Sequence, residues 1–455
     1  MIMRYSIILF LAIMAMAGTG LAADDLQTQS PNTTVQSFTP VEGADLMARL
    51  DAAQAKARAR QTPYWSAYTF DVRPGVAVDP AIREFNGSIN TFGDTSVFVG
   101  TTSGGLTVET RNLAIFLLRD PASNQITRME VYNLERKREY SGYPVYWLGR
   151  ANNEESLNYL RALAAAAPLD RLSERAVLGI ALHDDARVGS MLKNFITTSP
   201  NQRIRSSAVY WLGQVGGEQA FLASLVRNDA EDKEIRRSAA YGIGRSRDHG
   251  TVATLQGLYE SVKDVEIRRS IISAAGNSTD EQLAFTFLLG VAKNDPDWES
   301  RRTAIRQLGH FERADAVEQL IKIYGSDSNV EIKKAVLRSL SENKGARAED
   351  KLFEIARSNE PLDVRRQAIR VLGERVSQRS FDFLSTTAQS TDANAEVQVQ
   401  AVRAIGERRA EESVPLLIKI ARTHPNQLVR KQAIRSLGES GDPRAIEFFR
   451  EVLSK

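Results

Sequence analysis

Residues 364–373 read VRRQAIRVLG, and variants of this block of ten recur along most of the chain. Each block begins with an aliphatic residue, continues with basic residues and ends with a small residue that is usually glycine. The other clear copies are IRSSAVYWLG (204–213), IRRSAAYGIG (235–244), IRRSIISAAG (267–276), SRRTAIRQLG (300–309), IKKAVLRSLS (332–341), VQVQAVRAIG (397–406) and VRKQAIRSLG (429–438). Two weaker copies, YSGYPVYWLG (140–149) and LSERAVLGIA (172–181), precede them, and successive copies start 31 to 33 residues apart. An array of about ten copies at one period indicates a repeat protein.

The block has the residue spacing of a helix that is buried on one side. With its first residue as position 0, positions 0, 4, 5 and 8 are apolar or small, as in Val364, Ala368, Ile369 and Leu372. Each period also contains a second amphipathic segment, for example residues 413–422. Two helices of about ten residues and two turns account for one period, so the sequence predicts stacked helical hairpins. The glycine at position 9 fits two roles, close helix packing or a helix end.

This pattern, Ile/Val-Arg-x-x-Ala-Ile/Val-x-x-Leu/Ile-Gly, resembles HEAT repeats, most closely the short HEAT-like repeats of the PBS-lyase type. The resemblance covers residues 140–455 and implies an α-solenoid whose arginine-bearing helices line the inner, concave face. The period is shorter than the ~40–47 residues usual for HEAT repeats. Ser341 and Ala181 depart from the pattern at the glycine position, as do Ser300 and Tyr140 at the leading position. The predicted fold class is mostly α, a solenoid of about ten HEAT-like hairpins with a small N-terminal antiparallel β domain.

The N-terminal segment has the features of an export signal. Residues 1–22 contain a basic start at Arg4, an apolar run over 7–17, and small residues around a cleavage site at Gly20-Leu21-Ala22. The alternative is a retained anchor, because the uncharged stretch 5–23 is just long enough to span a membrane. Export of a chain without cysteine favours a bacterial periplasmic or secreted protein. We expect no transmembrane span once the signal is cleaved.

Residues 23–139 are predicted to form a leader and a β-rich domain. Residues 23–60 are interpreted as a disordered leader followed by a short helix that places Leu46, Leu50 and Ala53 on one face. Residues 61–139 are predicted to be a small antiparallel β domain, because residues 64–72 alternate as in a half-buried strand. Further predicted strands are 97–102, 106–118 and 126–134, the last two joined by a turn at 120–124.

Composition excludes much catalytic chemistry. The 455 residues include no cysteine and four histidines, so disulfides, thiolate catalysis and cysteine-ligated metals are impossible. A net charge of +3 argues against general nucleic-acid binding. No phosphate-binding loop, nucleophile elbow or zinc-protease motif is present, and His183-Asp184-Asp185 is interpreted as a capping turn. We therefore predict a protein that is not an enzyme, without catalytic, cofactor-binding or metal-binding residues.

Position 6 of the block is arginine in five consecutive copies. The predicted contacts to a partner are Arg306, Arg338, Arg370, Arg403 and Arg435. Two interpretations remain open. The arginines pair with glutamates at position 10 in ladders that tie repeats together, or they form a basic groove for an acidic partner segment or a polyanion. The basic residues at positions 1 and 2 are interpreted as local ion pairs with solvated stems.

Three of the first copies carry tyrosine at position 6, where the later ones carry arginine, and two of these also carry tryptophan at position 7. A predicted aromatic patch consists of Tyr146, Trp147, Tyr210, Trp211 and Tyr241, and the first four are the predicted contacts to a partner. It either packs the β domain on the first repeats or binds a peptide, since tyrosine and tryptophan are frequent anchors at interfaces.

These features predict a non-enzymatic interaction scaffold in the bacterial cell envelope. Its concave face would bind a protein or peptide partner, and no nucleic acid. Two alternatives remain. The resemblance implies a bilin-lyase-like enzyme or a chaperone for a chromophore protein, because some proteins with such repeats attach bilins to phycobiliproteins. The arginine column allows a polyanion-binding module, whose binding would depend strongly on salt.

Overall fold

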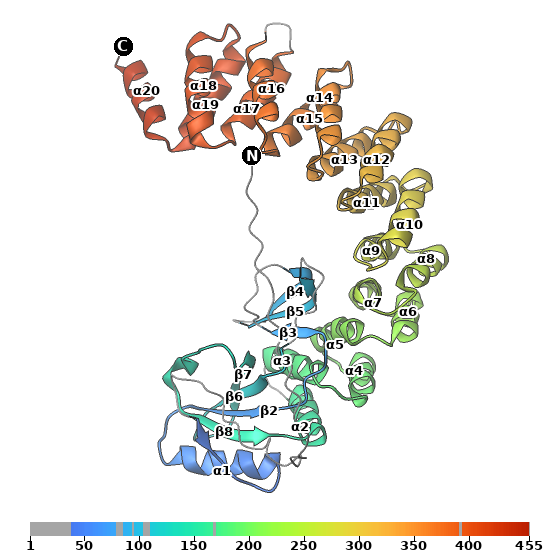
Figure 1. The fold of residues 1–455 in the computed structure, drawn as a ribbon, viewed down its shortest axis with the longest axis vertical. Helices are drawn as coiled ribbons and strands as arrows, with labels where there is room; N and C mark the ends of the chain where they lie inside the picture. Colours follow the sequence, from blue (N-terminus) through green and yellow to red (C-terminus); the bar gives the residue numbers. More distant parts are fainter. Residues whose placement is uncertain are drawn as a thin grey trace, which may run out of the picture. The chain divides into compact units, whose positions relative to one another are not determined.

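The computed structural model describes residues 38–78, 85–92, 95–102, 110–166, 170–390 and 394–454 (Figure 1). The predicted signal peptide, residues 1–22, and the leader up to residue 37 lie outside this range. The chain forms two compact units that divide between Asn152 and Asn153. No helix in the described ranges is both long and apolar enough to cross a membrane.

The first unit is built on a five-stranded sheet with strand order β1-β8-β2-β6-β7. Its strands are β1 (Thr39–Pro40), β2 (Tyr64–Thr69), β6 (Leu113–Arg119), β7 (Ile126–Asn133) and β8 (Val145–Arg150). Strands β2, β6 and β7 are antiparallel, and the expected turn joins β6 to β7. Strand β8 is parallel to β1 and β2, so the sheet is mixed and the prediction of an antiparallel sheet is wrong for that edge.

A second sheet in this unit is antiparallel and has the order β3-β5-β4. Its strands are β3 (Val76–Val78), β4 (Phe85–Phe92) and β5 (Thr95–Thr102). Strand β5 contains the predicted strand 97–102, whereas residues 106–109 of the next predicted strand lie outside the described ranges.

Helix α1 (Leu46–Arg58) belongs to the β unit rather than to a separate leader. It packs on β2 and β8 through the buried side chains of Leu46, Leu50 and Ala53. Arg49 Nη1 donates hydrogen bonds to the backbone carbonyls of Leu148 at 2.5 Å and Arg150 at 2.9 Å. The expected helix is therefore present, but the predicted domain boundary at residue 61 is wrong.

Strand β2 is buried on both faces, not half-buried as its alternating pattern predicted. It lies between β6 and β8 with α1 on one side, while Trp65 on the other side belongs to an aromatic core. In that core Phe116 stacks on Tyr140 with ring centroids 5.0 Å apart, and Trp65 Nε1 donates to the Tyr140 carbonyl at 2.9 Å. Large side chains thus fill both faces of the strand.

The segment 140–149 is not a repeat. Tyr140–Gly142 form a 3₁₀ turn and Val145–Arg150 form strand β8. The predicted start of the solenoid at residue 140 is therefore wrong, and the helical array begins at α2. The pentapeptide VYWLG is a strand at 145–149 and a helix at 209–213.

The described part of the second unit is an array of helices. These are α2 (Asn153–Ala166), α3 (Asp170–Ala181), α4 (Arg187–Thr198), α5 (Gln202–Val215), α6 (Gln219–Arg227), α7 (Lys233–Arg245), α8 (Thr251–Ser261), α9 (Val265–Ala275), α10 (Glu281–Asn294), α11 (Trp298–Gly309), α12 (Ala314–Ser326), α13 (Val330–Glu342), α14 (Ala346–Arg357), α15 (Leu362–Glu374), α16 (Gln378–Gln389), α17 (Ala395–Gly406), α18 (Ala410–Thr423), α19 (Gln427–Ser440) and α20 (Pro443–Leu453). The predicted α-solenoid is confirmed. Its odd-numbered helices from α5 to α19 contain the repeated block, and α3 contains the weaker copy at 172–181.

The odd-numbered helices form the inner layer of the solenoid (Figure 1). Each packs directly on the next, from α3 through α19, whereas the even-numbered helices touch one another much less. This difference is expected for a curved stack, because its inner layer is more crowded than its outer layer. The block helices thus lie on the inner side, as the resemblance implied.

The glycine at position 9 serves close helix packing. Gly213 in α5 lies against the backbone of Gly242 in α7, and Gly244 in α7 lies against the backbone of Ala274 in α9. The residue that faces each glycine is at position 7 of the next block, and it is usually small. Each of the two helices is thus close enough to its neighbour that a Cβ atom on the glycine would overlap it.

Candidate functional site on the inner face

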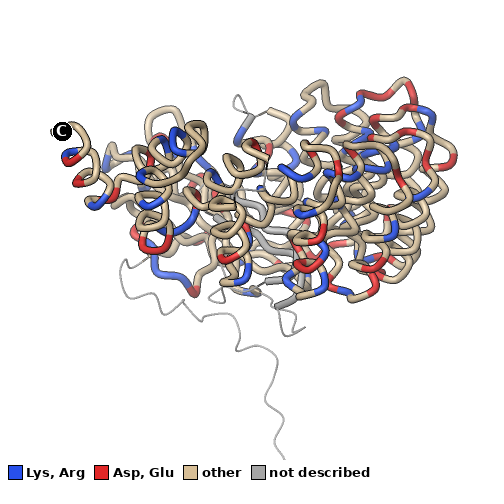
Figure 2. Tube along the Cα trace, turned by 90° about the horizontal axis from the view of Figure 1, so that it is seen from above, with Lys and Arg blue, Asp and Glu red and all other residues tan. Residues whose placement is uncertain are grey.

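The predicted arginine column lies on consecutive inner helices. Arg306 is on α11, Arg338 on α13, Arg370 on α15, Arg403 on α17 and Arg435 on α19. Four of these side chains are exposed, and Arg370 is half-buried. Acidic and basic residues both occur along the solenoid, so the column is not part of a surface of one sign (Figure 2).

Two of the five arginines pair with the glutamate one turn later. Arg370 Nη1 pairs with Glu374, and Arg435 Nε lies 2.9 Å from Glu439 Oε1. Both pairs stay within one helix and do not join neighbouring repeats. The ladder interpretation therefore holds for part of the column only, and not in the form that ties repeats together.

The other three arginines have no such partner. Glu342, which Arg338 was expected to reach, instead lies with its Oε2 3.2 Å from His310 Nδ1. Arg306, Arg338 and Arg403 make no ion pair or side-chain hydrogen bond with any residue in the ranges that the structure describes. Three exposed cations on the inner face are thus available to a ligand.

The basic residue at position 1 has a structural role. The side chain of Arg236 is 4% exposed, and its Nε donates to the carbonyl of Val226, near the end of the preceding helix, at 3.0 Å. Arg430 Nη1 donates in the same way to the carbonyl of His424 at 2.6 Å. Several of these side chains also reach acids in the turn of the next repeat, as in Arg205–Glu231, Arg268–Asp295, Arg301–Asp327 and Lys333–Glu360. Position 1 therefore ties repeats together.

The basic residue at position 2 is neutralised by an acid just before a block. Lys334 Nζ lies 2.6 Å from Glu331 Oε1 in its own helix, and Arg366 Nη1 lies 3.3 Å from Glu396 Oε2 in the next inner helix. The acid is present before six blocks, as Glu234, Glu266, Glu299, Glu331, Asp363 and Glu396. In α19 the residue just before the block is Leu428 and not an acid. In α17 the residue at position 2 is Val399 and not a base. The alternation of acidic and basic residues therefore ends between α17 and α19.

At this interruption the inner face contains a groove of about 370 Å³ between α15, α17 and α19. We call it the inner groove. Its lining includes the cations Arg366, Arg403, Lys431 and Arg435 and the apolar side chains of Val399 and Leu428. It thus brings together two of the five predicted arginines. Lys431, Val399 and Leu428 were not predicted, although the departure of Leu428 and Val399 from their columns was readable in the sequence.

The four predicted aromatic contacts lie in different units. Tyr146 and Trp147 are in strand β8 of the first unit, and Tyr210 and Trp211 are in α5 of the second. Tyr146 is 2% exposed and Trp211 is 1% exposed, so both are core residues and the prediction that they contact a partner is wrong. Trp147 and Tyr210 are half-buried, and Trp147 stacks on Phe38.

Residues 219–299, 285–373 and 381–455 each match the family model for HEAT repeats. The chain belongs to the HEAT-repeat family. No curated protein matches the sequence. Among solved structures, human deoxyhypusine hydroxylase in complex with glycerol is 15% identical, covers 63% of this chain and 96% of its own, and has a TM-score of 0.27. The phycocyanin lyase complex of CpcE and CpcF from Nostoc is 17% identical, covers 55% of this chain and 93% of its own, and has a TM-score of 0.28. Likenesses this distant carry no argument about activity or partner.

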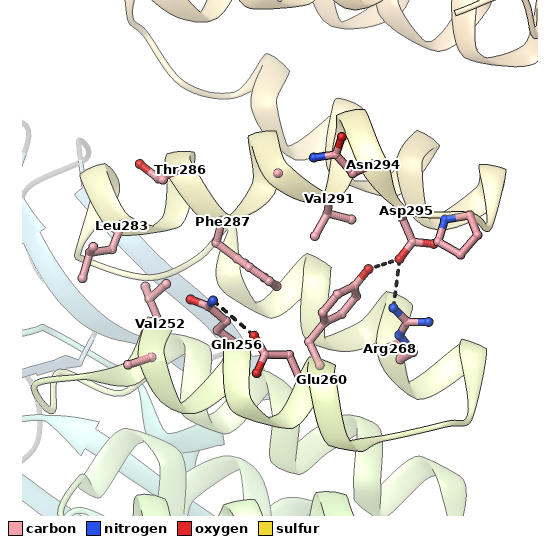
Figure 3. Close-up of a pocket in the computed structure, with 14 residues that line it drawn as sticks. Val252, Gln256, Glu260, Arg268, Leu283, Thr286, Phe287, Val291, Asn294 and Asp295 are labelled. Atoms are coloured by element: carbon pink, nitrogen blue, oxygen red, sulfur yellow. Dashed lines mark hydrogen bonds and ion pairs between the residues drawn. The ribbon is translucent and has the colours of Figure 1, made fainter.

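The HEAT solenoid also has an outer groove, between α8 and α10, of about 530 Å³ (Figure 3). Its lining is largely apolar and includes Phe287, whose ring lies edge-on to Tyr259. The Tyr259 hydroxyl donates to the carboxylate of Asp295, and Arg268 Nη2 pairs with the same carboxylate at 2.9 Å. Burial raises the pKa of Asp295. These polar groups are already bonded to one another and hold adjacent repeats together.

The histidine of the predicted capping turn is a buried structural residue of the HEAT solenoid. His183 Nδ1 lies 2.7 Å from the carbonyl oxygen of Gly179, and Nε2 lies 2.8 Å from Ser156 Oγ in α2. Burial lowers the pKa of His183 to about 4. In the ranges the structure describes, no three histidine or acidic side chains are grouped so as to hold a metal ion.

The buried histidine predicts a loss of stability in mild acid. The unfolded chain binds a proton at His183 below pH ~6.5, whereas the folded chain does so only near pH 4, so stability falls as the pH drops through this window. The loss attributable to His183 is expected to reach about 3 kcal/mol. Urea unfolding at several pH values should therefore show a shallower pH dependence in His183→Gln than in wild type. The exposed His249 provides the control, because His249→Gln should keep the wild-type slope. Equal slopes in all three proteins would contradict the assignment.

Proposed function

We propose that this HEAT-repeat protein is a non-enzymatic scaffold that binds a protein partner through the inner face of helices α11 to α19. One observation carries the proposal. Arg306, Arg338 and Arg403 are exposed at equivalent positions of the inner layer and have no partner among the described residues. Like charges at one helical position of successive repeats repel one another, so an acidic partner would relieve this repulsion.

The proposed location is the bacterial cell envelope. The basic start at Arg4, the apolar run over residues 7–17 and the small residues before Ala23 support export. The absence of cysteine is compatible with an exported array, because each repeat closes its core on its neighbours and needs no disulfide.

The triple variant Arg306→Ala, Arg338→Ala, Arg403→Ala is expected to remain helical and to lose partner capture at least about tenfold, since surface charges at an interface govern encounter and specificity. The measurement is crosslinking and pull-down from an envelope extract, with helicity followed by circular dichroism. The matched control is Arg347→Ala, Arg379→Ala, Arg422→Ala, which removes three exposed arginines from the even-numbered helices.

Unchanged capture together with lowered stability would contradict the scaffold proposal and support a purely structural column. A polyanion ligand is distinguished by salt, because each neutralised phosphate or sulfate makes binding fall steeply as ionic strength rises. The acids Glu396 and Glu439, which pair with Arg366 and Arg435 of the inner groove, weigh against a long polyanion.

A further inference from the structure

We infer that the inner groove between α15, α17 and α19 recognises a segment of a protein partner in which a carboxylate lies next to an aliphatic or aromatic side chain. This inference rests on the proposed scaffold function and specifies which segment of the partner the scaffold would bind. It is carried by a break in the charge pattern of the inner face.

In the preceding inner helices, acids and bases at the start of the block neutralise one another. Glu234 pairs with Arg237 at 3.6 Å, and Glu331 pairs with Lys334 at 2.6 Å. Glu299 is shared between Arg302 of its own helix and Arg269 of the preceding inner helix. These pairs leave little unbalanced charge for a ligand along that row.

The last two inner helices break this pattern in a coordinated way. Val399 replaces the base in α17, and Leu428 replaces the acid in α19, so an apolar pair occupies the place where earlier repeats have an ion pair. The Leu428 side chain is 60% exposed. An apolar side chain contributes no stabilising free energy while it stays in contact with water. The substitution thus creates an exposed apolar floor inside a charged surface.

The missing acid also leaves a cation without its usual neighbour. Lys431 lies one turn after Leu428, where Lys334 in the earlier helix has Glu331. Among the described residues, neither Lys431 nor Arg403 makes an ion pair, while Arg366 and Arg435 are each held by one glutamate. The groove therefore presents two uncompensated cations beside an apolar floor.

This combination fits one class of segment. A carboxylate can bind between Arg403 and Lys431 while a neighbouring apolar side chain covers Val399 and Leu428. The volume of about 370 Å³ is at the lower end of the range for ligand clefts, so it suits a few side chains of a peptide and not a folded domain. Glu396 in the lining limits the number of negative charges that the groove accepts.

The test uses the full chain and three fluorescent peptides of equal length, with alternating aspartate and leucine, aspartate and serine, or lysine and leucine. Anisotropy titrations at about 0.15 M salt keep long-range charge effects screened. We expect the aspartate–leucine peptide to bind, the aspartate–serine peptide to bind at least about tenfold more weakly, and the lysine–leucine peptide not to bind.

The decisive variant is Leu428→Glu, which restores the acid found before six earlier blocks. It should lower the affinity for the aspartate–leucine peptide at least about tenfold. Its matched control is Val376→Glu, which adds the same charge at an apolar residue that is 89% exposed and outside the groove, and which should bind like wild type. Circular dichroism of both variants checks that they fold.

Equal binding of the aspartate–leucine and aspartate–serine peptides, or wild-type affinity in Leu428→Glu, would overturn the inference. If the chain binds the peptide as expected but captures no envelope protein, the scaffold function is refuted and the peptide specificity of the groove stands. If the chain captures an envelope protein but binds none of the peptides, the groove inference is refuted and the scaffold function stands.

Discussion

Gly244→Ala is expected to destabilise the solenoid by about 3 kcal/mol, although alanine is the better helix former, because the added methyl group over-packs a helix contact. A Cβ atom at Gly244 would lie 2.2 Å from the carbonyl oxygen of Ala274 and 2.7 Å from its carbonyl carbon. Both are backbone atoms of α9, so the overlap is relieved only if α7 and α9 separate. Urea unfolding measures the total loss. Hydrogen exchange should localise it to these two helices, since repeats in an array unfold in part independently.

Gly438→Ala is the matched control for this prediction. Gly438 occupies the same position in the last block, and a Cβ atom there would meet no atom of the described residues within 4 Å beyond its own stretch of helix. This substitution should stabilise the protein by about 0.5–1 kcal/mol through the lower conformational entropy cost of alanine in a helix. A similar effect of both substitutions would show that helix propensity, and not the close approach of α7 and α9, determines why glycine is used.

The repeat array was predictable because its information is local and repeated. Each block has the same spacing of apolar residues, so the same helical pattern recurs many times along the chain. The contrast is the pentapeptide VYWLG, which is a strand at 145–149 and a helix at 209–213. Val, Tyr and Trp favour strands and leucine favours helices, but these preferences are weak enough that tertiary contacts decide. At 145–149 that contact is parallel pairing with β2, some 80 residues earlier, which no local pattern reveals.

The same limit explains the errors in the β unit and the site. Burial of Tyr146 and Trp211 depends on neighbours that are distant in sequence, so their aromatic character alone suggested a surface role. The arginine column followed from spacing, but which arginines find a glutamate depends on side-chain rotamers. Arg370 reaches Glu374, whereas Glu342 is held by His310 and not by Arg338.

Glu349→Ala is expected to destabilise the solenoid by about 3 kcal/mol, because removal of one partner leaves the other charge of a buried pair uncompensated. Glu349 in α14 and Arg375 after α15 have side chains only 6% and 10% exposed, with Arg375 Nε 3.7 Å from Glu349 Oε1. The same carboxylate accepts hydrogen bonds from the hydroxyls of Ser377 at 2.5 Å and Ser380 at 2.9 Å. One side chain thus connects α14 to the start of α16.

The control for this prediction is Arg379→Ala, which removes an exposed partner of Glu349 and should cost less than about 1 kcal/mol. The double variant Glu349→Leu, Arg375→Met should recover much of the stability lost in Glu349→Ala, because an apolar pair of similar volume carries no desolvation penalty. Urea unfolding of the four proteins gives the comparison. If Glu349→Ala cost no more than Arg379→Ala, the buried carboxylate would have no special role in joining these repeats, and the stability of this region would rest on its apolar contacts alone.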